Sequence, residues 1–331
     1  MQKKRKIALI AGAVLMICIA FVIVLFTVIL PNSEKNEDYR AAAALYDQGR
    51  YEEAIAAFTA LDGYKDSAAR IQKCETAIKD KQYEAALEQY NAENYGEAYA
   101  ALTELNGYKD SAELLEKVRP IYFAQLFAEA EPGSSVYFGS YEQTYRQGVE
   151  DIEWTVLKKE GDRLLVVSKY ALDCQRFSTE FADITWETSP LRAWLNETFL
   201  NAAFSAEERA RIPRVTVTAD RNPEYDTAPG TDTEDRIFLL SIEEALAYFE
   251  TDSARQCSGT DYCYDAGADK YPNGNCWWWL RTPGENTTAT TYVRSDGTIS
   301  YWGDSYVLHI ENYTIEVYYA VRPAMWIDLQ T

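Results

Sequence analysis

The pentapeptide Gly63-Tyr64-Lys65-Asp66-Ser67 returns unchanged as Gly107-Tyr108-Lys109-Asp110-Ser111. The offset between the copies is 44 residues (from 63 to 107), and residues before each copy match at the same offset. These residues are Tyr46, Tyr51, Glu53, Ala54, Ala57 and Leu61, matched by Tyr90, Tyr95, Glu97, Ala98, Ala101 and Leu105. A fixed period of this kind is typical of a repeat architecture. The region 39–130 is therefore predicted to contain two copies of one structural unit.

The repeated region has the composition and spacing of helices. It is rich in Ala, Leu, Glu and Tyr, it has no proline before Pro120, and its apolar residues recur at helical spacing. We expect helices near 39–49, 51–61, 67–93 and 95–105, and a last one from Ser111. An all-α region follows from this pattern.

The segment from Leu45 to Phe58 resembles the turn and second helix of a tetratricopeptide repeat, through Gly49, Tyr51 and Glu53-Ala54-Ile55. Alanines at a helix crossing let two helices approach closely. A period of 44 residues departs from the 34 residues of a tetratricopeptide unit. Such arrays bind peptides or partner helices in a groove, but two units seldom make one. A rigid spacer is therefore favoured, and binding of a protein partner stays open.

The N-terminal stretch is basic and then apolar. Lys3, Lys4, Arg5 and Lys6 precede a run without charge from Ile7 to Leu30. As a helix this run spans roughly 36 Å, enough to cross a bilayer. We expect a cytoplasmic tail at 1–6, a transmembrane helix acting as signal anchor at 7–30 and a linker at 31–38. Because basic residues stay on the cytoplasmic side, the bulk of the chain would be extracytoplasmic, as in a single-pass protein of the cell membrane.

The chain is strongly acidic, with a formal net charge of −20. Without the four basic residues of the tail, 28 basic residues (32 less 4) stand against 52 acidic ones. A field of this sign repels phosphate backbones, so no nucleic acid is expected as a partner.

Beyond Glu131-Pro132-Gly133-Ser134 the composition changes to β-branched and aromatic residues separated by turn residues. We place a linker at 131–135 and one α+β domain at 136–329. The expected strands are Val136–Tyr141, Ile152–Lys158, Arg163–Ser168, Ile237–Leu240, Thr291–Arg294, Thr298–Tyr301 and Tyr318–Ile327. The expected helix starts are Ser189-Pro190, Ser205 with Glu208, and Ser241 with Glu244.

This second domain carries several distinctive motifs. They are Ile152-Glu153-Trp154-Thr155-Val156-Leu157, Leu191-Arg192-Ala193-Trp194-Leu195-Asn196, Phe238-Leu239-Leu240-Ser241, Trp278-Trp279-Leu280-Arg281-Thr282-Pro283-Gly284 and Ala320-Val321-Arg322-Pro323-Ala324-Met325-Trp326. The region resembles an uncharacterised bacterial family found on exported, often membrane-anchored proteins. More distantly, the last two motifs resemble the closing hairpins of C-type-lectin-like and formylglycine-generating-enzyme-like domains. That resemblance implies an irregular sheet core with long loops, and it brings no activity with it.

The aromatic concentration around residue 278 is the first candidate for ligand binding. Exposed Trp277, Trp279 or Trp302 could stack on sugar rings or peptides. Arg281 and Arg322 could bind a carboxylate through two parallel hydrogen bonds. Buried arginines paired with acids would give the same pattern, and that structural role is favoured.

The acidic loop that begins at Asp261 is the candidate metal site. Asp261, Asp265, Asp269 and Asn273 lie among glycines and offer oxygen atoms to a hard cation such as calcium. No glutamate closes the loop as in an EF-hand. A solvated loop without metal is the favoured alternative.

The cysteines and the single histidine limit the chemistry that the chain can perform. Cys257, Cys263 and Cys276 are the candidates for a disulfide, with the pairing left open, because an exported protein permits such bonds. His309 is the only histidine, so a catalytic triad would have to include it. Its strand-like surroundings favour a structural role.

These features favour a multi-domain binding protein of the bacterial cell envelope over an enzyme. Its expected ligand is a cell-wall carbohydrate or a protein partner. The alternative is an extracytoplasmic enzyme, either a hydrolase that uses His309 or a cysteine-dependent oxidase. A third possibility is that the repeats capture a partner and the second domain is passive.

Overall fold

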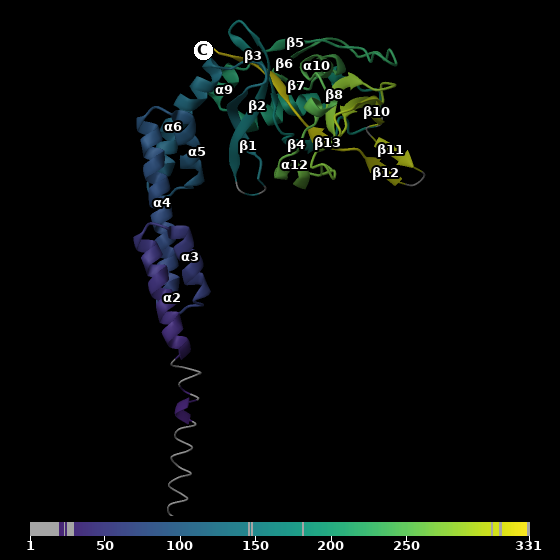
Figure 1. Cartoon of the computed structure of the whole chain (residues 1–331). Helices are drawn as coiled ribbons and strands as arrows, with labels where there is room; N and C mark the ends of the chain where they lie inside the picture. Colours follow the sequence, from purple (N-terminus) through teal and green to yellow (C-terminus); the bar gives the residue numbers. More distant parts are fainter. Residues whose placement is uncertain are drawn as a thin grey trace, which may run out of the picture. The chain divides into compact units, whose positions relative to one another are not determined.

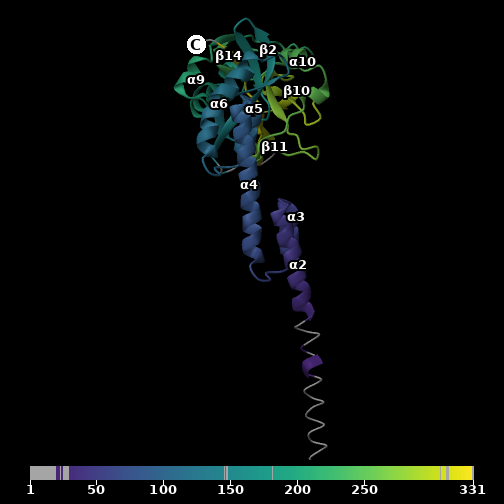
Figure 2. The same ribbon diagram turned by 60° about the vertical axis from the view of Figure 1, so that its left-hand side comes forward.

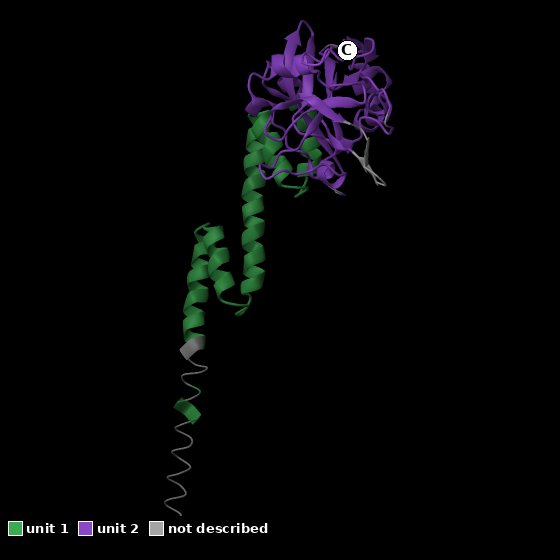
Figure 3. Cartoon of the chain, turned by 90° about the vertical axis from the view of Figure 1, so that its right-hand side faces the viewer, with its two compact units in different colours: residues 1–122 green, residues 123–331 purple. Residues whose placement is uncertain are grey.

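The computed structural model describes residues 20–22, 24, 30–144, 146, 148–180, 182–305, 307–310 and 313–329. The chain divides into two compact units, residues 1–122 and residues 123–331 (Figure 3). The division falls inside helix α6 (Ser111–Ala128). Each unit has its own packed interior.

The described part of unit 1 is helical from residue 30 onward. Its helices are α2 (Leu30–Asp47), α3 (Tyr51–Ala60), α4 (Ser67–Asn91), α5 (Tyr95–Glu104) and the first part of α6. Helix α3 packs against α2 and α4, and α5 packs against α4 (Figures 1 and 2). The predicted helices are confirmed, but α2 starts earlier than expected and includes residues 31–38, which were predicted to be a linker.

The two copies of the repeat make the same polar contacts. The Tyr39 hydroxyl donates a hydrogen bond to the Asp66 carboxylate, and the Tyr83 hydroxyl donates one to Asp110. In each copy the lysine before the aspartate lies over the ring of that tyrosine, at 4.8 Å in the first copy and 4.7 Å in the second. In each copy the aspartate of the pentapeptide is thus bonded to a tyrosine 27 residues earlier in the chain.

The buried side chains of the two copies also correspond. Ala42, Ala54, Phe58, Leu61 and Cys74 in the first copy match Ala86, Ala98, Leu102, Leu105 and Val118 in the second. The buried alanines carry no bulk beyond Cβ, which lets neighbouring helices approach closely. The 44-residue repeat predicted from the sequence is therefore a repeat of packing as well.

The expected transmembrane helix is corrected by the structure. Among the described helices, none combines the length and the apolar character needed to cross a bilayer. This finding overturns the helix expected at 7–30 and the single-pass membrane location inferred from it. Of that run only residues 20–22, 24 and 30 are described, and the rest of the predicted span lies outside the described residues.

Unit 2 is an α+β unit with two main sheets among its described residues. The first sheet has the order β1 (Ser135–Glu142), β2 (Val149–Glu160), β3 (Arg163–Ser168), β14 (Ala324–Asp328) and β7 (Ile237–Phe238). The second has the order β10 (Ile299–Ser305), β9 (Ala289–Val293), β8 (Trp278–Pro283), β13 (Tyr319–Val321) and β4 (Asp173–Gln175). Paired strands are antiparallel except β8 and β13.

Short hairpins and helices complete the unit. The hairpins are β5 (Val215–Val217) with β6 (Thr233–Asp235) and β11 (Val307–Ile310) with β12 (Tyr313–Glu316). The helical segments are η2 (Trp186–Thr188), α7 (Pro190–Trp194), η3 (Leu195–Phe199), α8 (Leu200–Ala203), α9 (Ala206–Ala210), α10 (Ile242–Tyr248), α11 (Asp252–Arg255) and α12 (Asp261–Asp265). The helix starts predicted at Ser189, Ser205 and Ser241 are confirmed, since each serine side chain accepts a backbone N–H of its helix.

The last predicted strand is divided in the structure. Residues Tyr318–Ile327 were expected to form one strand, but β13 lies in the second sheet and β14 in the first. Arg322 and Pro323 separate them, and proline has no N–H to donate to a ladder. The segment therefore crosses from one sheet to the other.

Gly297 offers a test of the packing at the β9–β10 turn. Its φ is +86°, and a Cβ there would lie 1.7 Å from the Asp252 carbonyl oxygen. We expect Gly297→Ala to lower the free energy of unfolding by about 3 kcal/mol or more, through backbone strain and overlap together. Gly161 has φ +58° with open space around it, so Gly161→Ala should cost only about 1 kcal/mol. Equal losses in urea unfolding would contradict the contact with Asp252.

Candidate ligand-binding site

Trp277 packs among three tyrosine rings. Its ring is stacked on Tyr271 at 5.1 Å and 11° and on Tyr292 at 5.0 Å and 20°. The Tyr319 ring meets it edge-on at 5.4 Å. The residue is half-buried. The structure thus gives Trp277 a packing role, and ligand binding by its exposed part stays a prediction.

Trp279 is buried, against the expectation of an exposed ring. Its Nε1 donates to the Gln175 carbonyl oxygen at 2.8 Å, and its ring packs on Tyr319 at 4.4 Å and on Phe177 at 5.9 Å. All residues of β8 are buried because the strand lies inside the second sheet. Alternation along a strand exposes one face only when that face meets solvent.

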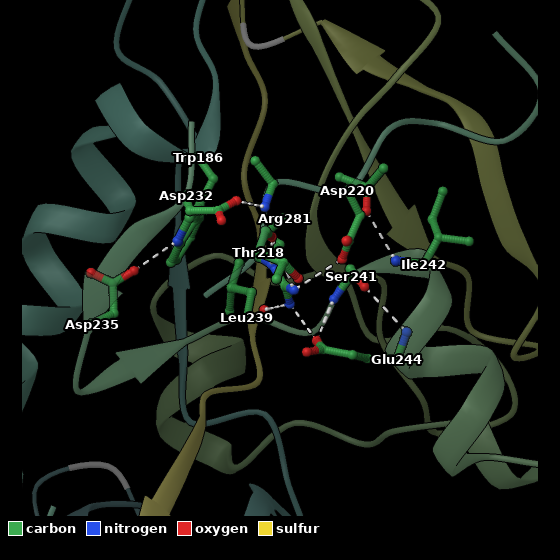
Figure 4. Close-up of polar contacts among 12 residues, drawn as sticks. Trp186, Thr218, Asp220, Asp232, Asp235, Leu239, Ser241, Ile242, Glu244 and Arg281 are labelled. Atoms are coloured by element: carbon green, nitrogen blue, oxygen red, sulfur yellow. Dashed lines mark hydrogen bonds and ion pairs between the residues drawn. The ribbon is translucent and has the colours of Figure 1, made fainter. Parts of the chain in front are cut away.

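Arg281 is held inside the unit by carbonyl and carboxylate oxygens. Its Nη2 lies 3.1 Å from Asp220 and its Nη1 forms an ion pair with Glu244 (Figure 4). Nη1 also donates to the Leu239 carbonyl oxygen at 2.9 Å. These partners occupy the fork that would bind a ligand carboxylate, so the structure places Arg281 in the structural role.

Arg322 is also interior. Its Nε donates to the Ser168 carbonyl oxygen at 2.9 Å, and its guanidinium lies over the rings of Phe249 at 5.0 Å and Trp278 at 5.1 Å. Only 4 % of the residue is exposed. It is not available to a ligand at the surface.

Trp302 differs from the other candidates because 59 % of it is exposed. Tyr225, which is 40 % exposed, meets it edge-on with ring centroids 6.1 Å apart and an interplanar angle of 80°. Sequence reasoning missed Tyr225, which lies 77 residues before Trp302 in a loop without a motif of its own. We call Trp302 and Tyr225 the aromatic pair.

A buried asparagine fixes the loop that carries Tyr225. The Nδ2 of Asn222 donates to the carbonyl oxygens of Pro283 at 2.9 Å, Gly284 at 3.2 Å and Tyr301 at 2.7 Å. Its Oδ1 accepts the backbone N–H of Tyr225 at 3.4 Å, as well as that of the residue before it at 3.0 Å. One amide thus joins the loop to the ends of β8 and to β10. Such support pre-organises the aromatic pair before any ligand binds.

The backbone beneath Trp302 is packed closely against a second segment. The Glu285 N–H donates to the Trp302 carbonyl oxygen at 2.8 Å. A Cβ on Gly284 would lie 2.3 Å from the same oxygen, and a Cβ on Gly303 would lie 2.6 Å from the Thr290 carbonyl oxygen. Only glycine permits these two approaches.

Acidic residues lie next to the aromatic pair along the backbone. Glu224 and Asp226 flank Tyr225 in the chain, and the Glu285 N–H is bonded to the Trp302 carbonyl oxygen. Arg221 is already paired with Asp226 at 3.1 Å. These carboxylates are hydrogen-bond acceptors, and their negative charge disfavours anionic ligands.

The acidic loop does not gather into a metal site. Within the residues that the structure describes, no three His, Cys, Asp or Glu side chains are grouped so that they could hold a metal ion. Asn273 instead donates from Nδ2 to the Ser295 carbonyl oxygen at 2.7 Å. Asp261, Asp265 and Asp269 thus form no such group among these residues, and Asp261 and Asp265 lie in helix α12 rather than in a loop. Calcium binding there stays a prediction.

The cysteines expected to form a disulfide are free thiols. Cys257, Cys263 and Cys276 are buried, as are Cys74 and Cys174. His309 lies in β11 opposite Thr314, and the prediction for its side chain lies outside what the structure describes.

The buried carboxyl group of Asp173 lies in the same region as Cys174 and Cys263. Asp173 accepts hydrogen bonds from the Tyr141 hydroxyl at 2.6 Å, the Cys174 N–H at 2.7 Å and the Gln175 amide at 2.9 Å. Burial raises the pKa of the Asp173 carboxyl above its ordinary value, although these three donors oppose the shift. The charged form is therefore a cost to the folded state.

The anchoring of the loop by Asn222 can be tested with a single substitution, since Asn222→Asp puts an oxygen where Nδ2 now faces three carbonyl oxygens. We expect a loss of about 3 kcal/mol in unfolding free energy at neutral pH. The exposed Asn286 provides the control, because Asn286→Asp should cost less than about 1 kcal/mol. Equal stability of the two variants in urea would show that Asn222 does not hold the loop.

The raised pKa of Asp173 predicts a pH effect on stability. A carboxyl whose folded pKa lies above its unfolded pKa favours the folded state at low pH, and this stabilisation is lost as the pH rises through the folded pKa. Asp173→Asn should remove that decline, as followed by thermal unfolding between about pH 4 and 7. Asp296 has a lowered pKa because Thr298 donates hydrogen bonds to it, so Asp296→Asn should instead remove stability that is lost as the pH falls. An unchanged profile for Asp173→Asn would contradict the assignment.

Comparison with known sequences identifies the family of unit 2. The model of the family described as "Domain of unknown function (DUF6273)" matches residues 161–329. No curated protein and no solved structure matches the chain. The matched region covers β3 to β14 and contains both members of the aromatic pair. The chain therefore belongs to the DUF6273 family of domains of unknown function.

Proposed function

We propose that this chain is a binding protein and that the aromatic pair holds a neutral carbohydrate. One observation carries the proposal, namely that Trp302 and Tyr225 are exposed while buried hydrogen bonds of Asn222 fix the loop of Tyr225 to β8 and to β10, the strand of Trp302. Large apolar side chains that are both exposed and fixed in place are typical of recognition surfaces.

The surrounding groups favour a neutral sugar over other small ligands. A sugar ring presents an apolar face of C–H groups to an aromatic ring, and its hydroxyls donate hydrogen bonds to nearby acceptors. Such acceptors are carried by Glu224 and Asp226, the chain neighbours of Tyr225, and by Glu285, whose N–H is bonded to the Trp302 carbonyl oxygen. An anionic sugar would meet repulsion from the same carboxylates. The distant resemblance to C-type-lectin-like domains is part of this proposal as an expectation about the fold, and no sugar chemistry is carried over from it.

A protein partner is the second ligand class, and the tetratricopeptide-like character of the repeats belongs to this alternative. An exposed Trp–Tyr pair is also a common anchor at protein interfaces. Both ligand classes would bind at the aromatic pair. They are distinguished by whether a carbohydrate or a protein competes for binding there.

Binding of the full chain to a panel of neutral and anionic polysaccharides tests the proposal. We expect saturable binding to a neutral polymer, weakened at least tenfold, or about 1.4 kcal/mol, by Trp302→Ala and by Tyr225→Ala. Tyr170 is an exposed tyrosine away from the pair, and Tyr170→Ala should leave the affinity unchanged.

Two results would contradict the carbohydrate. One is binding that Trp302→Ala does not weaken, and the other is the lack of binding to every neutral polymer. If the chain captures a protein and Trp302→Ala abolishes that capture, the aromatic pair is the binding surface but its ligand is a protein.

A further inference from the structure

Cys257 and Cys276 are in direct contact although they are 19 residues apart. The Cys276 N–H donates to the Cys257 carbonyl oxygen at 2.9 Å, and the Cys276 Sγ lies 3.4 Å from the same oxygen. A backbone hydrogen bond of this length brings the two Cα atoms to roughly the 4.4–6.8 Å that a disulfide requires. The Cys257 Sγ lies 3.6 Å from the Lys169 carbonyl oxygen, one residue along from the Ser168 carbonyl that Arg322 Nε contacts.

The buried guanidinium of Arg322 affects the pKa of Cys257. Arg322 is only 4 % exposed, and its Nη1 has no hydrogen-bond partner in the described part of the chain. Its Nε bond goes to a neutral carbonyl oxygen and its two faces lie on neutral rings. A buried cation is costly unless an anion compensates it. The charge of Arg322 lowers the pKa of Cys257 and so favours the thiolate form of that residue.

The pKa values of the two thiols are shifted in opposite directions. Burial raises the pKa of Cys257, but the neighbouring Cys276 side chain and the charge of Arg322 outweigh burial and lower that pKa below its ordinary value. The neighbouring Cys257 side chain and burial both raise the pKa of Cys276. These directions favour Cys257 as the attacking thiol and Cys276 as the thiol that resolves it.

We propose that Cys257 and Cys276 form a peroxide-sensitive dithiol that closes reversibly to a disulfide, with Arg322 positioned to stabilise the attacking thiolate. In the first step the Cys257 thiolate attacks one oxygen of hydrogen peroxide, the O–O bond breaks, and Cys257 sulfenic acid and hydroxide form. In the second step the Cys276 sulfur attacks the Cys257 sulfur, the S–O bond breaks, and a disulfide and water form. Two thiols are oxidised and one peroxide is reduced.

The neighbouring thiols lack this arrangement. Burial raises the pKa of Cys174 to about 12 and raises the pKa of Cys263 still further. The Cys263 Sγ lies 3.1 Å from the Asp173 carbonyl oxygen. Both therefore remain thiols, and Cys263 serves as a matched control inside the same cluster.

Mild oxidation of the full chain with hydrogen peroxide, followed by alkylation and peptide mapping, tests the proposal. We expect one cross-linked peptide pair, Cys257 with Cys276, lighter by two hydrogens and restored by a dithiol reductant. The pair should form in Cys263→Ser as in the parent chain. In Cys276→Ser the disulfide should be lost and Cys257 should be trapped as a sulfenic acid by dimedone.

Three outcomes would overturn the proposal. They are a cross-link between any other two cysteines, full alkylation of both residues after peroxide treatment, and dimedone labelling of Cys276→Ser at a residue other than Cys257. Circular dichroism shows whether each variant is folded. If Cys276→Ser does not fold, the peptide map of Cys263→Ser decides.

Discussion

The C-terminal segment that crosses between the two sheets is the constraint on which unit 2 depends. Strand β13 pairs with β8 and β4, and β14 pairs with β3 and β7. Between them the Pro323 carbonyl oxygen accepts the Ser168 N–H at 2.9 Å, while the Nε of Arg322 donates to the Ser168 carbonyl oxygen at the same distance. Both polar groups of the Ser168 backbone are thus satisfied by the crossing, which joins two sheets into one interior.

This shared interior explains why the tryptophan-rich strand is not a binding surface. Strand β8 lies between β9 and β13, and every one of its side chains is buried. Trp278 and Trp279 are fully buried, and Trp277 is stacked on the rings of Tyr271 and Tyr292. Among the candidate tryptophans predicted from the sequence, Trp302 is the exposed one, and it lies in β10 between Ser300 and Asp304, where the register of the ladder with β9 shifts.

The same region combines a binding surface with a reactive interior, and each depends on an unusual polar group. Asn222 is buried and gives its amide to three backbone carbonyl oxygens. Arg322 is buried and holds a charge next to two thiols. Both side chains would be costly without these partners. Family membership extends over both groups without naming an activity for either.

Local sequence patterns were enough to predict the features that depend on neighbouring residues. These are the 44-residue repeat, its helices, the capped helix starts at Ser205 and Ser241 and the strands β2 and β3, and the structure confirms them. The apolar run at 7–30 predicted a membrane span that no described helix provides. Exposure and pairing were decided only by tertiary structure. Tyr225 meets Trp302, and Cys257 meets Cys276, because the sheets bring together segments that are distant in the chain, and neither burial nor such contacts are encoded in neighbouring residues.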